Sequence, residues 1–444
     1  MKRSILTFAT LAAGAGLAAQ PAMAAVPDAE VVSGGTAYIL NTLLFLIGGF
    51  LVMWMAAGFA MLEAGLVRSK NVSTQCLKNI GLYSIAGLMF WVCGYNIAYP
   101  GAFNGFIGGF SGIYPMQAVG ADIMQGGEEA AGYSIASDWF FQMVFCATTA
   151  SIVSGTVAER VKIVPFFIFV AVLTGIVYPV VVSWEWGEGY LDSEWAFSDF
   201  AGSTLVHSTG GWAALMGALI IGSRAGRFGA DGKVNVFPAS SIPLATLGTF
   251  ILWLGWFGFN GASQLAMGTV GDVGDVSKIF VNTNMAAAGG VVTAIILTQL
   301  RYKKADVTMA LNGALAGLVS ITAEPLTPSV GQAIAIGAVG GAIVVFTVPL
   351  LDKLKIDDVV GAIPVHLFAG IWGTMIVPFT NDGASYAGQG VGVLMTGVWV
   401  CVTSGVLWYA LKLTIGVRPS EEEEVGGLDH AEIGVEAYPE FART

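Results

Sequence analysis

The stretch DFAGSTLVH, residues 199–207, and the stretch DVVGAIPVH, residues 358–366, share the pattern D-x-x-G-x-x-x-V-H. In both, a glycine follows the final histidine four places later. The chain has only three histidines, and these two patterns place His207 and His366 inside long apolar runs. Ionisable residues at matching places in two halves of a hydrophobic chain indicate a shared internal site.

The composition is that of a membrane protein. Hydrophobic residues make up 55% of the chain and charged residues 11%, and the mean hydropathy is +0.73. Soluble proteins carry roughly 25% charged residues. The 60 glycines are scattered within apolar runs, where small residues let transmembrane helices approach closely. We therefore predict an all-α membrane protein with several spans.

The N-terminus has the features of a secretory signal. Lys2 and Arg3 precede an apolar stretch over residues 5–19, and residues 22–24 read A-M-A, an A-x-A cleavage site. The pattern predicts a cleaved signal peptide over residues 1–24 and a mature N-terminus outside the inner membrane, in the periplasm. An uncleaved first span is the alternative.

Apolar runs close to the roughly 20 residues that cross a bilayer recur with polar breaks between them. We predict eleven spans: Tyr38–Leu62, Leu77–Ala98, Trp139–Thr156, Pro165–Val182, Ser203–Ile221, Pro243–Phe259, Ile279–Leu300, Val307–Ile321, Val330–Leu351, Ile363–Phe379 and Val391–Ile415.

Charge supports this topology. With the N-terminus outside, the predicted outer loops hold one basic residue, Lys278, and the inner loops and tail hold sixteen. The inner ones are Arg68, Lys70, Lys78, Arg160, Lys162, Arg224, Arg227, Lys233, Arg301, Lys303, Lys304, Lys353, Lys355, Lys412, Arg418 and Arg443. Such an asymmetry is the positive-inside pattern.

The predicted outer loops are acidic. Their carboxylates are Asp122, Glu128, Glu129, Asp138, Glu185, Glu188, Asp192, Glu194, Asp272, Asp275, Glu324 and Asp382. Taken one by one, these read as solvated loop residues. Together they create a negative field that favours an arriving cation.

The topology explains the repeated pattern. His207 lies in span five and His366 in span ten, so each pattern lies in the last span of a half of five spans. Because five is an odd number, the second half is inverted relative to the first. Eight residues of helix advance about 12 Å, so both histidines should reach the middle of the membrane from opposite faces. Inverted repeats with a site at their interface are a recurrent transporter plan. Span eleven lies outside the repeat.

The histidine pair permits several chemistries. A structural pair of neutral histidines is one reading, and haem ligation is another, which would make the chain a redox enzyme. Two histidines with no third ligand nearby would leave another metal under-coordinated. The four cysteines are far apart, with no C-x-x-C, so neither a zinc site nor a disulfide framework is indicated. In a dry lumen a cation is strongly disfavoured, whereas a solute that sheds its proton is not; ammonium can do so and potassium cannot.

The chain resembles the ammonium transporter/methylammonium permease family, which is related to the Rh proteins. The resemblance covers nearly the whole mature chain. The motifs that carry it are residues 59–68 (FAMLEAGLVR) with Lys70-Asn71, residues 141–145 (FQMVF), residues 157–160 (VAER), the two repeated patterns, and residues 255–260 (GWFGFN) with Ser263.

The resemblance implies an eleven-span homotrimer with one pore per subunit, residues 25–415, transporting ammonium or ammonia and possibly methylammonium without a cofactor, a metal or an enzymatic activity. By position, Trp186, Phe145 and Ser263 would form the outer ammonium site, although Trp184 and Trp195 lie in the same loop as Trp186. A cation binds to aromatic faces through their quadrupoles.

Phe145 and Phe259 would stack as a gate beneath that site, and His207 and His366 would line the lumen. Asp199, Asp358 and Trp256 would have supporting roles, the two aspartates by anchoring the starts of spans five and ten.

Residues 416–444 form an acidic tail that is either a disordered segment or a regulatory one. Residues 427–429 (GLD) and Ala437-Tyr438 resemble the family's cytoplasmic end, which docks a trimeric PII-type regulator. Where the family commonly has His-Gly-Glu, this chain has residues 433–435, IGV. Two functions stay open: an ammonium permease, or an ammonium-sensing receptor with little transport.

Overall fold

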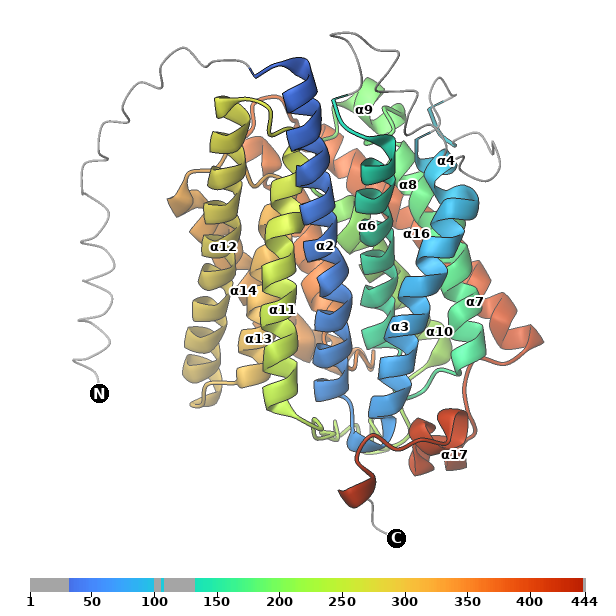
Figure 1. Cartoon of the computed structure of the whole chain (residues 1–444). Coiled ribbons are helices and arrows are strands. Elements are labelled where there is room, and N and C mark those ends of the chain that lie inside the picture. The colour runs from blue at the N-terminus through green and yellow to red at the C-terminus, as the bar shows by residue number, and fades with distance from the viewer. Residues whose placement is uncertain (1–31, 100–104, 108–131, 442–444) are drawn as a thin grey trace, which may run out of the picture.

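The computed structural model describes residues 32–99, 105–107 and 132–441 (Figure 1). The predicted signal peptide, residues 1–24, lies outside these ranges. The described residues form helices and one isolated β-bridge between Phe228 and Val234. The prediction of an all-α protein is confirmed.

Eleven helical segments run along the long axis of the bundle in the described part of the chain, and adjacent ones alternate in direction. The first five are α2 (Gly34–Leu66); α3 (Val72–Met89) continued by η3 (Phe90–Gly94) and α4 (Tyr95–Ala98); α6 (Ile135–Thr156); α7 (Ile163–Val172) continued by η5 (Leu173–Val177) and α8 (Tyr178–Ser183); and η6 (Ser203–Ser208) continued by α10 (Thr209–Ile221).

The second half repeats this plan. Its segments are α11 (Ile242–Gly261), α12 (Val270–Tyr302), α13 (Val307–Thr322), α14 (Val330–Lys353), and η8 (Ile363–Phe368) continued by α15 (Ala369–Met375) and η9 (Val377–Phe379). The final segment is α16 (Tyr386–Thr414). Short helices outside the bundle include η2 (Ser69–Asn71), α9 (Tyr190–Trp195), η7 (Ala262–Gln264), α17 (Glu421–Gly426), η10 (Asp429–Ile433) and η11 (Pro439–Phe441). All eleven predicted spans therefore have a helical counterpart.

The helices differ in how apolar they are. In the described residues, eight are long and apolar enough by composition to cross a membrane, and Val307–Thr322 and Ile363–Phe379 are shorter apolar helices. Helix α6 belongs to neither group because it carries many polar side chains. Of its 22 residues 18 are buried, so α6 touches its neighbours on all sides and does not need an apolar face for lipid.

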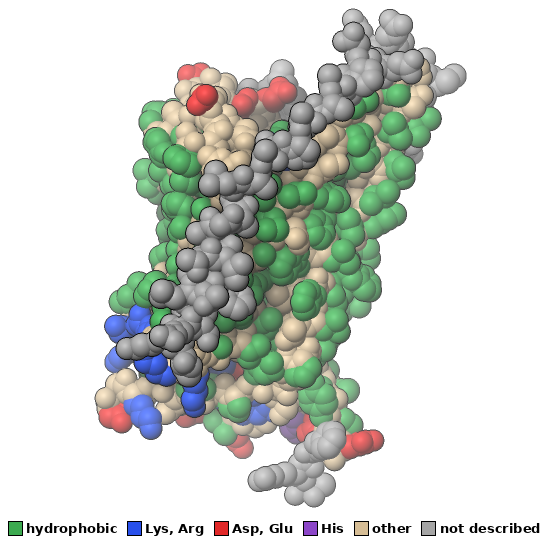
Figure 2. Space-filling model, turned by 90° about the vertical axis from the view of Figure 1, so that its left-hand side faces the viewer, with side chains coloured by type: hydrophobic (Ala, Val, Ile, Leu, Met, Phe, Trp, Pro, Cys, Tyr) green, Lys and Arg blue, Asp and Glu red, His purple; other side chains and the backbone are tan. Residues whose placement is uncertain are grey.

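The outer surface of the bundle is a hydrophobic belt. Figure 2 shows a face on which hydrophobic side chains cover the middle, while Lys and Arg side chains gather at the lower end. We call this lower end, where the residues after α16 pack, the tail end, and the opposite end the vestibule end. A basic cluster at one rim of an apolar belt is typical of a membrane protein with its positive side facing the cytoplasm.

The first helices of the two halves, α2 and α11, pack together through glycines. A β-carbon on Gly65 would collide with the backbone of Ala245, and one on Gly248 would collide with the backbone of Leu62. The two helices can therefore approach closely only because neither residue has a side chain, as at small-residue contacts between membrane helices.

A buried ion network joins the loops at the tail end. The guanidinium of Arg224 donates to both oxygens of Asp357, at 2.9 Å each, and to Glu159 at 3.1 Å. Arg68 also pairs with Glu159, at 2.5 Å. Although burial alone would raise the pKa of Asp357, the hydrogen bonds and charge of Arg224 hold that pKa below its ordinary value.

The tail folds against this end of the bundle. Asp429 accepts hydrogen bonds from the backbone N–H groups of Ser73 and Thr74 at the start of α3. A negative charge at a helix N-terminus stabilises the helix. Glu424 is buried and accepts from Arg418 at 2.7 Å and from the backbone N–H of Ala225 at 2.6 Å. Specific hydrogen bonds thus hold the tail at Glu424 and at Asp429 against this end of the bundle.

Lys78, a predicted loop residue, belongs to the bundle interior. Charge patterning places Lys78 in an inner loop, but the structure begins α3 at Val72, and the side chain of Lys78 is 0% exposed. Its Nζ donates to Gln75 Oε1 and to the carbonyl of Ser154. The prediction was wrong because the polar first turns of α3 face other helices and not the surface.

Candidate functional site

The two histidines of the repeated pattern are in contact. Nδ1 of His207 lies 3.2 Å from Nδ1 of His366, and the rings stack with centroids 5.2 Å apart. Both side chains are buried, and neither pairs with a carboxylate in the part of the chain that the structure describes. Two charged rings would repel at this distance. In a neutral pair one Nδ1 donates and the other accepts, so one Nε2 remains an acceptor and the other an N–H donor.

Both histidines sit on the same unusual backbone. Each lies in a π-helical segment, η6 or η8, and each segment follows a glycine with positive φ, Gly202 at 107° and Gly361 at 80°. This left-handed conformation favours glycine, and π-helical turns are rare and frequently found at functional sites. The repeated sequence therefore folds in the same way from opposite ends of the bundle.

Asp199 is the hydrogen-bond acceptor for the start of η6. Its two carboxylate oxygens each accept two backbone N–H groups at 2.7 to 3.0 Å, from Gly202, Ser203, Thr204 and Leu205. Burial raises the pKa of Asp199 to about 6, against the opposing effect of these four donors. The carboxylate has little capacity left to accept a further proton or ligand, because all four lone-pair directions are used.

Asp358 has the matching position at the tail end with fewer donors. One oxygen accepts the N–H of Ile363 at 2.7 Å, and the other accepts the hydroxyl of Thr156 at 3.0 Å. Burial raises the pKa of Asp358 above its ordinary value. The two caps are related by the repeat but are not equivalent in hydrogen bonding.

An aromatic column leads from the vestibule end to the histidines. The rings of Phe145 and Phe259 stack with centroids 3.9 Å apart and planes at 24°. Trp186 lies 6.0 Å from Phe145 on one side, and His207 lies 5.2 Å from Phe259 on the other. Both phenylalanines are at most 1% exposed, and the stacked pair lies between the vestibule and the histidines.

Trp256 supports the column from the side. Its ring stacks on His207 at 5.0 Å, and its Nε1 donates to the hydroxyl of Thr322 at 2.8 Å. At the far side of the pair, the ring of Phe59 lies 6.2 Å from that of His366. Aromatic rings thus enclose the histidines above, beside and below.

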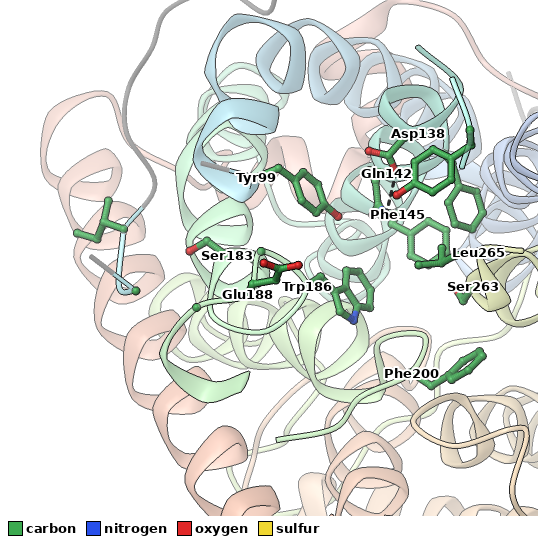
Figure 3. Close-up of a pocket in the computed structure, with 16 residues that line it drawn as sticks. Tyr99, Asp138, Gln142, Phe145, Ser183, Trp186, Glu188, Phe200, Ser263 and Leu265 are labelled. Carbon is green, nitrogen blue, oxygen red and sulfur yellow. Dashed lines mark hydrogen bonds between the residues drawn. The ribbon is translucent and has the colours of Figure 1, made fainter. Parts of the chain in front are cut away.

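The vestibule is a cavity of about 720 Å³ beside Phe145 (Figure 3). Trp186, Phe145 and Ser263 all line it, so the three residues predicted for the outer site come together from three segments. The indole Nε1 of Trp186 donates to the carbonyl of Asp199 at 3.0 Å, which fixes the ring orientation. The Ser263 hydroxyl donates to the carbonyl of Phe259 at 2.8 Å, so its oxygen stays available as an acceptor.

The geometry separates Trp186 from the two other tryptophans of its loop. Trp184 donates its Nε1 to the carbonyl of Phe106 and packs in the core, and the partly exposed Trp195 ends α9. Among the described residues that line the vestibule, Trp186 is present and Trp184 and Trp195 are not. Its neighbour Glu185 accepts the backbone N–H of Asp199 at 2.6 Å; burial and the charge of Asp199 raise the pKa of Glu185 well above its ordinary value.

Asp138 corrects one sequence interpretation. The charge pattern predicts a solvated loop carboxylate at this position, but α6 begins at Ile135 and places Asp138 in its first turn, 8% exposed, in the vestibule wall. Gln142 lines the same cavity from α6, and Tyr99 lines it from another segment. The sequence does contain a signal for this face, because positions 138, 142 and 145 share the i, i+4, i+7 spacing.

A second, much smaller cavity of about 10 Å³ lies on the other side of the pair and is lined by Phe59, Glu63 and His366, among others. It has about the minimum volume for one water molecule. Glu63 is fully buried; one oxygen accepts from Gln75, Asn79 and Ser154, and the other has no partner among the described residues. In the sequence, Glu63 stands out only as part of the motif over residues 59–68.

The described residues contain no group of three His, Cys, Asp or Glu arranged to hold a metal ion. The direct 3.2 Å contact between the histidine nitrogens leaves no space for an iron between them. The haem-ligand interpretation therefore does not fit the pair as it is placed.

The sequence of the chain matches those of known ammonium transporters. The profile of the Ammonium Transporter Family matches residues 43–438. The chain belongs to the ammonium transporter family. It is 39% identical to ammonium transporter Amt2 of Archaeoglobus fulgidus, over 90% of this chain and 88% of the relative. It is 38% identical to ammonium transporter Amt1 of Haloferax mediterranei, over 93% and 81%.

Solved structures show the same fold. A structure described as a sensor Amt protein superimposes with a TM-score of 0.82 at 33% identity, covering 90% of this chain and 99% of that one. The Mep2 protein of Candida albicans has a TM-score of 0.79 at 25% identity, covering 92% and 93%. The chain is thus a multi-pass membrane protein of a transporter family.

Proposed function

We propose that the chain transports ammonium across the bacterial inner membrane by binding it in the vestibule, removing its proton and passing ammonia along the histidine-lined lumen. The observation that carries this proposal is the unbroken column from Trp186 through Phe145 and Phe259 to the two histidines. Apolar rings close the column to a hydrated ion, and each histidine retains one nitrogen for a small polar solute.

Recruitment takes place at Trp186, Phe145 and Ser263. The two ring faces attract a cation through their quadrupoles, each interaction contributing about 0.5–2 kcal/mol. The Ser263 oxygen accepts one ammonium N–H. Because potassium has no N–H to donate, the serine favours ammonium over potassium of similar charge.

Deprotonation precedes the stacked gate: one N–H bond of ammonium breaks, the proton passes to water in the vestibule, and ammonia keeps the electron pair as its lone pair. A cation moving between Phe145 and Phe259 would lose its water in an apolar site, which is strongly unfavourable. Neutral ammonia avoids most of this penalty. Beyond the gate, the acceptor Nε2 of one histidine accepts a hydrogen bond from ammonia, and the Nε2–H of the other histidine donates one to the ammonia lone pair. The histidine pair therefore replaces two hydrogen bonds that ammonia makes with water.

The same proposal covers orientation and assembly. The signal peptide over residues 1–24 and the basic residues at the tail end support a periplasmic vestibule and a cytoplasmic tail. The family resemblance supports a homotrimer with a pore in each subunit and methylammonium as an alternative substrate.

The decisive experiment is a flux assay in proteoliposomes with ammonium, methylammonium and potassium in parallel. We expect ammonium to drive a flux that potassium does not mimic, and His207→Ala or His366→Ala to abolish the flux or its selectivity. His430→Ala, a histidine replacement at the exposed third position, is the matched control and should behave as the unmodified protein. Equal potassium flux, or an unchanged double histidine variant, would refute the proposal.

A sensing role is the second candidate, because the solved sensor Amt protein aligns over 90% of this chain. A receptor would bind ammonium saturably without measurable flux. The same proteoliposomes, combined with a binding measurement on the detergent-solubilised protein, separate the two roles.

Regulation by a PII-type protein at the tail is a further part of the proposal. The docked tail supports it, since Asp429 holds the start of α3 and Glu424 the loop after α10. A purified trimeric PII-type protein should reduce flux when added on the tail side. A tail carrying Asp429→Asn should bind it with altered affinity.

A further inference from the structure

We propose that Asp138 is the anionic acceptor that sets the affinity of the vestibule for ammonium-type cations. This inference rests on the proposed function and adds to it a residue that the family motifs quoted above do not include. The chemical class of ligand is a small cation with N–H donors, ammonium or methylammonium.

The side chain of Asp138 lies in the cavity wall. Asp138, Gln142 and Phe145 follow one face of α6 and all line the vestibule, and Figure 3 shows the carboxylate and the amide on that wall. The ring of Phe145 belongs to the stacked gate. The carboxylate is therefore on the same helical face as the gate, about two turns nearer the vestibule end.

The hydrogen bonding of Asp138 is incomplete. Its Oδ2 accepts the hydroxyl of Tyr95 at 2.6 Å, but its Oδ1 has only the amide of Gln142 at 3.5 Å, the outer limit of a hydrogen bond. Among the described residues no Lys, Arg or His lies within 4.0 Å of this carboxylate. A carboxylate that is 92% buried with one good neutral donor is poorly compensated.

Several other buried carboxylates are better compensated. Asp199 has four backbone donors, Glu159 and Asp357 have arginines, and Glu63 has three side-chain donors on one oxygen. Glu185 is also poorly compensated, because its only donor is the backbone N–H of Asp199 and its Oε2 has no partner among the described residues, but it does not line the vestibule. Asp138 is therefore the poorly compensated buried carboxylate that faces the cavity proposed to receive a cation. An ammonium ion there would supply both the missing charge and the missing donor.

The carboxylate also explains discrimination that aromatic faces alone do not give. Ring quadrupoles attract any monovalent cation. An oxygen lacking a donor favours a cation with N–H groups, because the charge-assisted hydrogen bond adds to the Coulomb attraction. Asp138 Oδ1 would then accept an N–H group of an ion in the vestibule, about two turns before that ion reaches Phe145.

The test is the concentration dependence of flux in proteoliposomes, with ammonium and methylammonium as probes. For Asp138→Asn we expect the half-saturating concentration to rise about tenfold or more, which corresponds to about 1.4 kcal/mol or more. Asp138→Ser is a second neutral variant with an acceptor for the Tyr95 hydroxyl, so either variant that folds is informative. Asp138→Glu retains the charge and should lie closer to the unmodified protein.

Tyr95→Phe separates the charge from the hydrogen bond. It removes the donor to Oδ2 and keeps the carboxylate, so the half-saturating concentration should stay the same or fall. If Asp138 only holds Tyr95 in place, Tyr95→Phe and Asp138→Asn will have equal effects and the inference is wrong.

The outcomes are distinguishable from failure of the proposed function. An unmodified protein without ammonium flux would refute the proposed function first. Flux in the unmodified protein with an unchanged half-saturating concentration in Asp138→Asn would refute only the role of Asp138. Loss of folding in both neutral variants, with a stable Asp138→Glu, would show a structural charge and would also overturn it.

Discussion

Replacing Asp199 by asparagine tests how the histidine-bearing turn is held. The two side chains have almost the same size, so packing stays unchanged. The aspartate accepts two backbone N–H groups on each oxygen. Asparagine has one oxygen, so two of the four N–H groups would face an NH₂ group that can only donate. Each buried donor left without an acceptor costs about 1–3 kcal/mol, which gives roughly 2–6 kcal/mol for the two.

Asp358→Asn is the matched control, because the repeat gives it the same location at the other end. There the Asn oxygen can still accept the N–H of Ile363, and the amide can donate to the hydroxyl of Thr156, which can act as donor or acceptor. Both hydrogen bonds survive, so the loss should be about 1 kcal/mol or less.

Two measurements check this difference: thermal unfolding of both variants in the same detergent, and ammonium flux in proteoliposomes. We expect Asp199→Asn to unfold at a clearly lower temperature and to lose most of its flux, because the turn positions both His207 and the carbonyl that holds Trp186. Asp358→Asn should remain near the unmodified protein in both. Equal effects of the two substitutions, or a stable and active Asp199→Asn, would refute the argument that donor count decides the outcome.

Three further predictions concern the tail end and the helix contacts. Arg224→Met should destabilise the protein by about 3–5 kcal/mol, because it leaves the buried Asp357 and Glu159 without their shared partner; chemical unfolding of the variant checks this. The pKa of Asp357 is held below its ordinary value of 3.8, so its stabilising contribution is present above pH 3.8 and is lost as the pH falls below it; acid titration of unfolding should show this loss in the unmodified protein and not in Arg224→Met. Gly248→Leu should push α11 away from the backbone at Leu62 and reduce the yield of folded protein, whereas Gly274→Leu, at a position with open space, should not; size-exclusion chromatography of the two variants distinguishes them.

The spans could be predicted because the membrane imposes a local rule. A helix in lipid needs about 20 apolar residues in a row, and this can be read without knowing its neighbours. The same rule explains the residues that were misassigned. The first turns of α3, with Lys78, and of α6, with Asp138, are polar but buried against protein. A sequence window cannot distinguish them from loops, since the compensating partners come from other helices.

The site could be predicted in part. The duplicated pattern indicated that His207 and His366 would meet, and they lie 3.2 Å apart. Which of three tryptophans joins the vestibule could not be read from the sequence, because it depends on a hydrogen bond from Trp186 to the backbone of Asp199. The π-helical turns could not be predicted from the sequence either. Only the Asp and Gly of the pattern mark their position, because the change from α-helical to π-helical hydrogen bonds depends on the packing around the turn.

The inverted repeat by itself would make the two ends of the route alike, and the side chains make them different. On one side of the histidines the space is about 720 Å³, and on the other about 10 Å³. The large side has a carboxylate, Asp138, with one good donor, whereas the small side has Glu63 with three donors on one oxygen. The large cavity has room for a hydrated cation, whereas the small one has room only for a molecule about the size of water or ammonia. The backbone symmetry therefore supplies the central pair, while the difference between its two sides follows from residues that the repeat does not share.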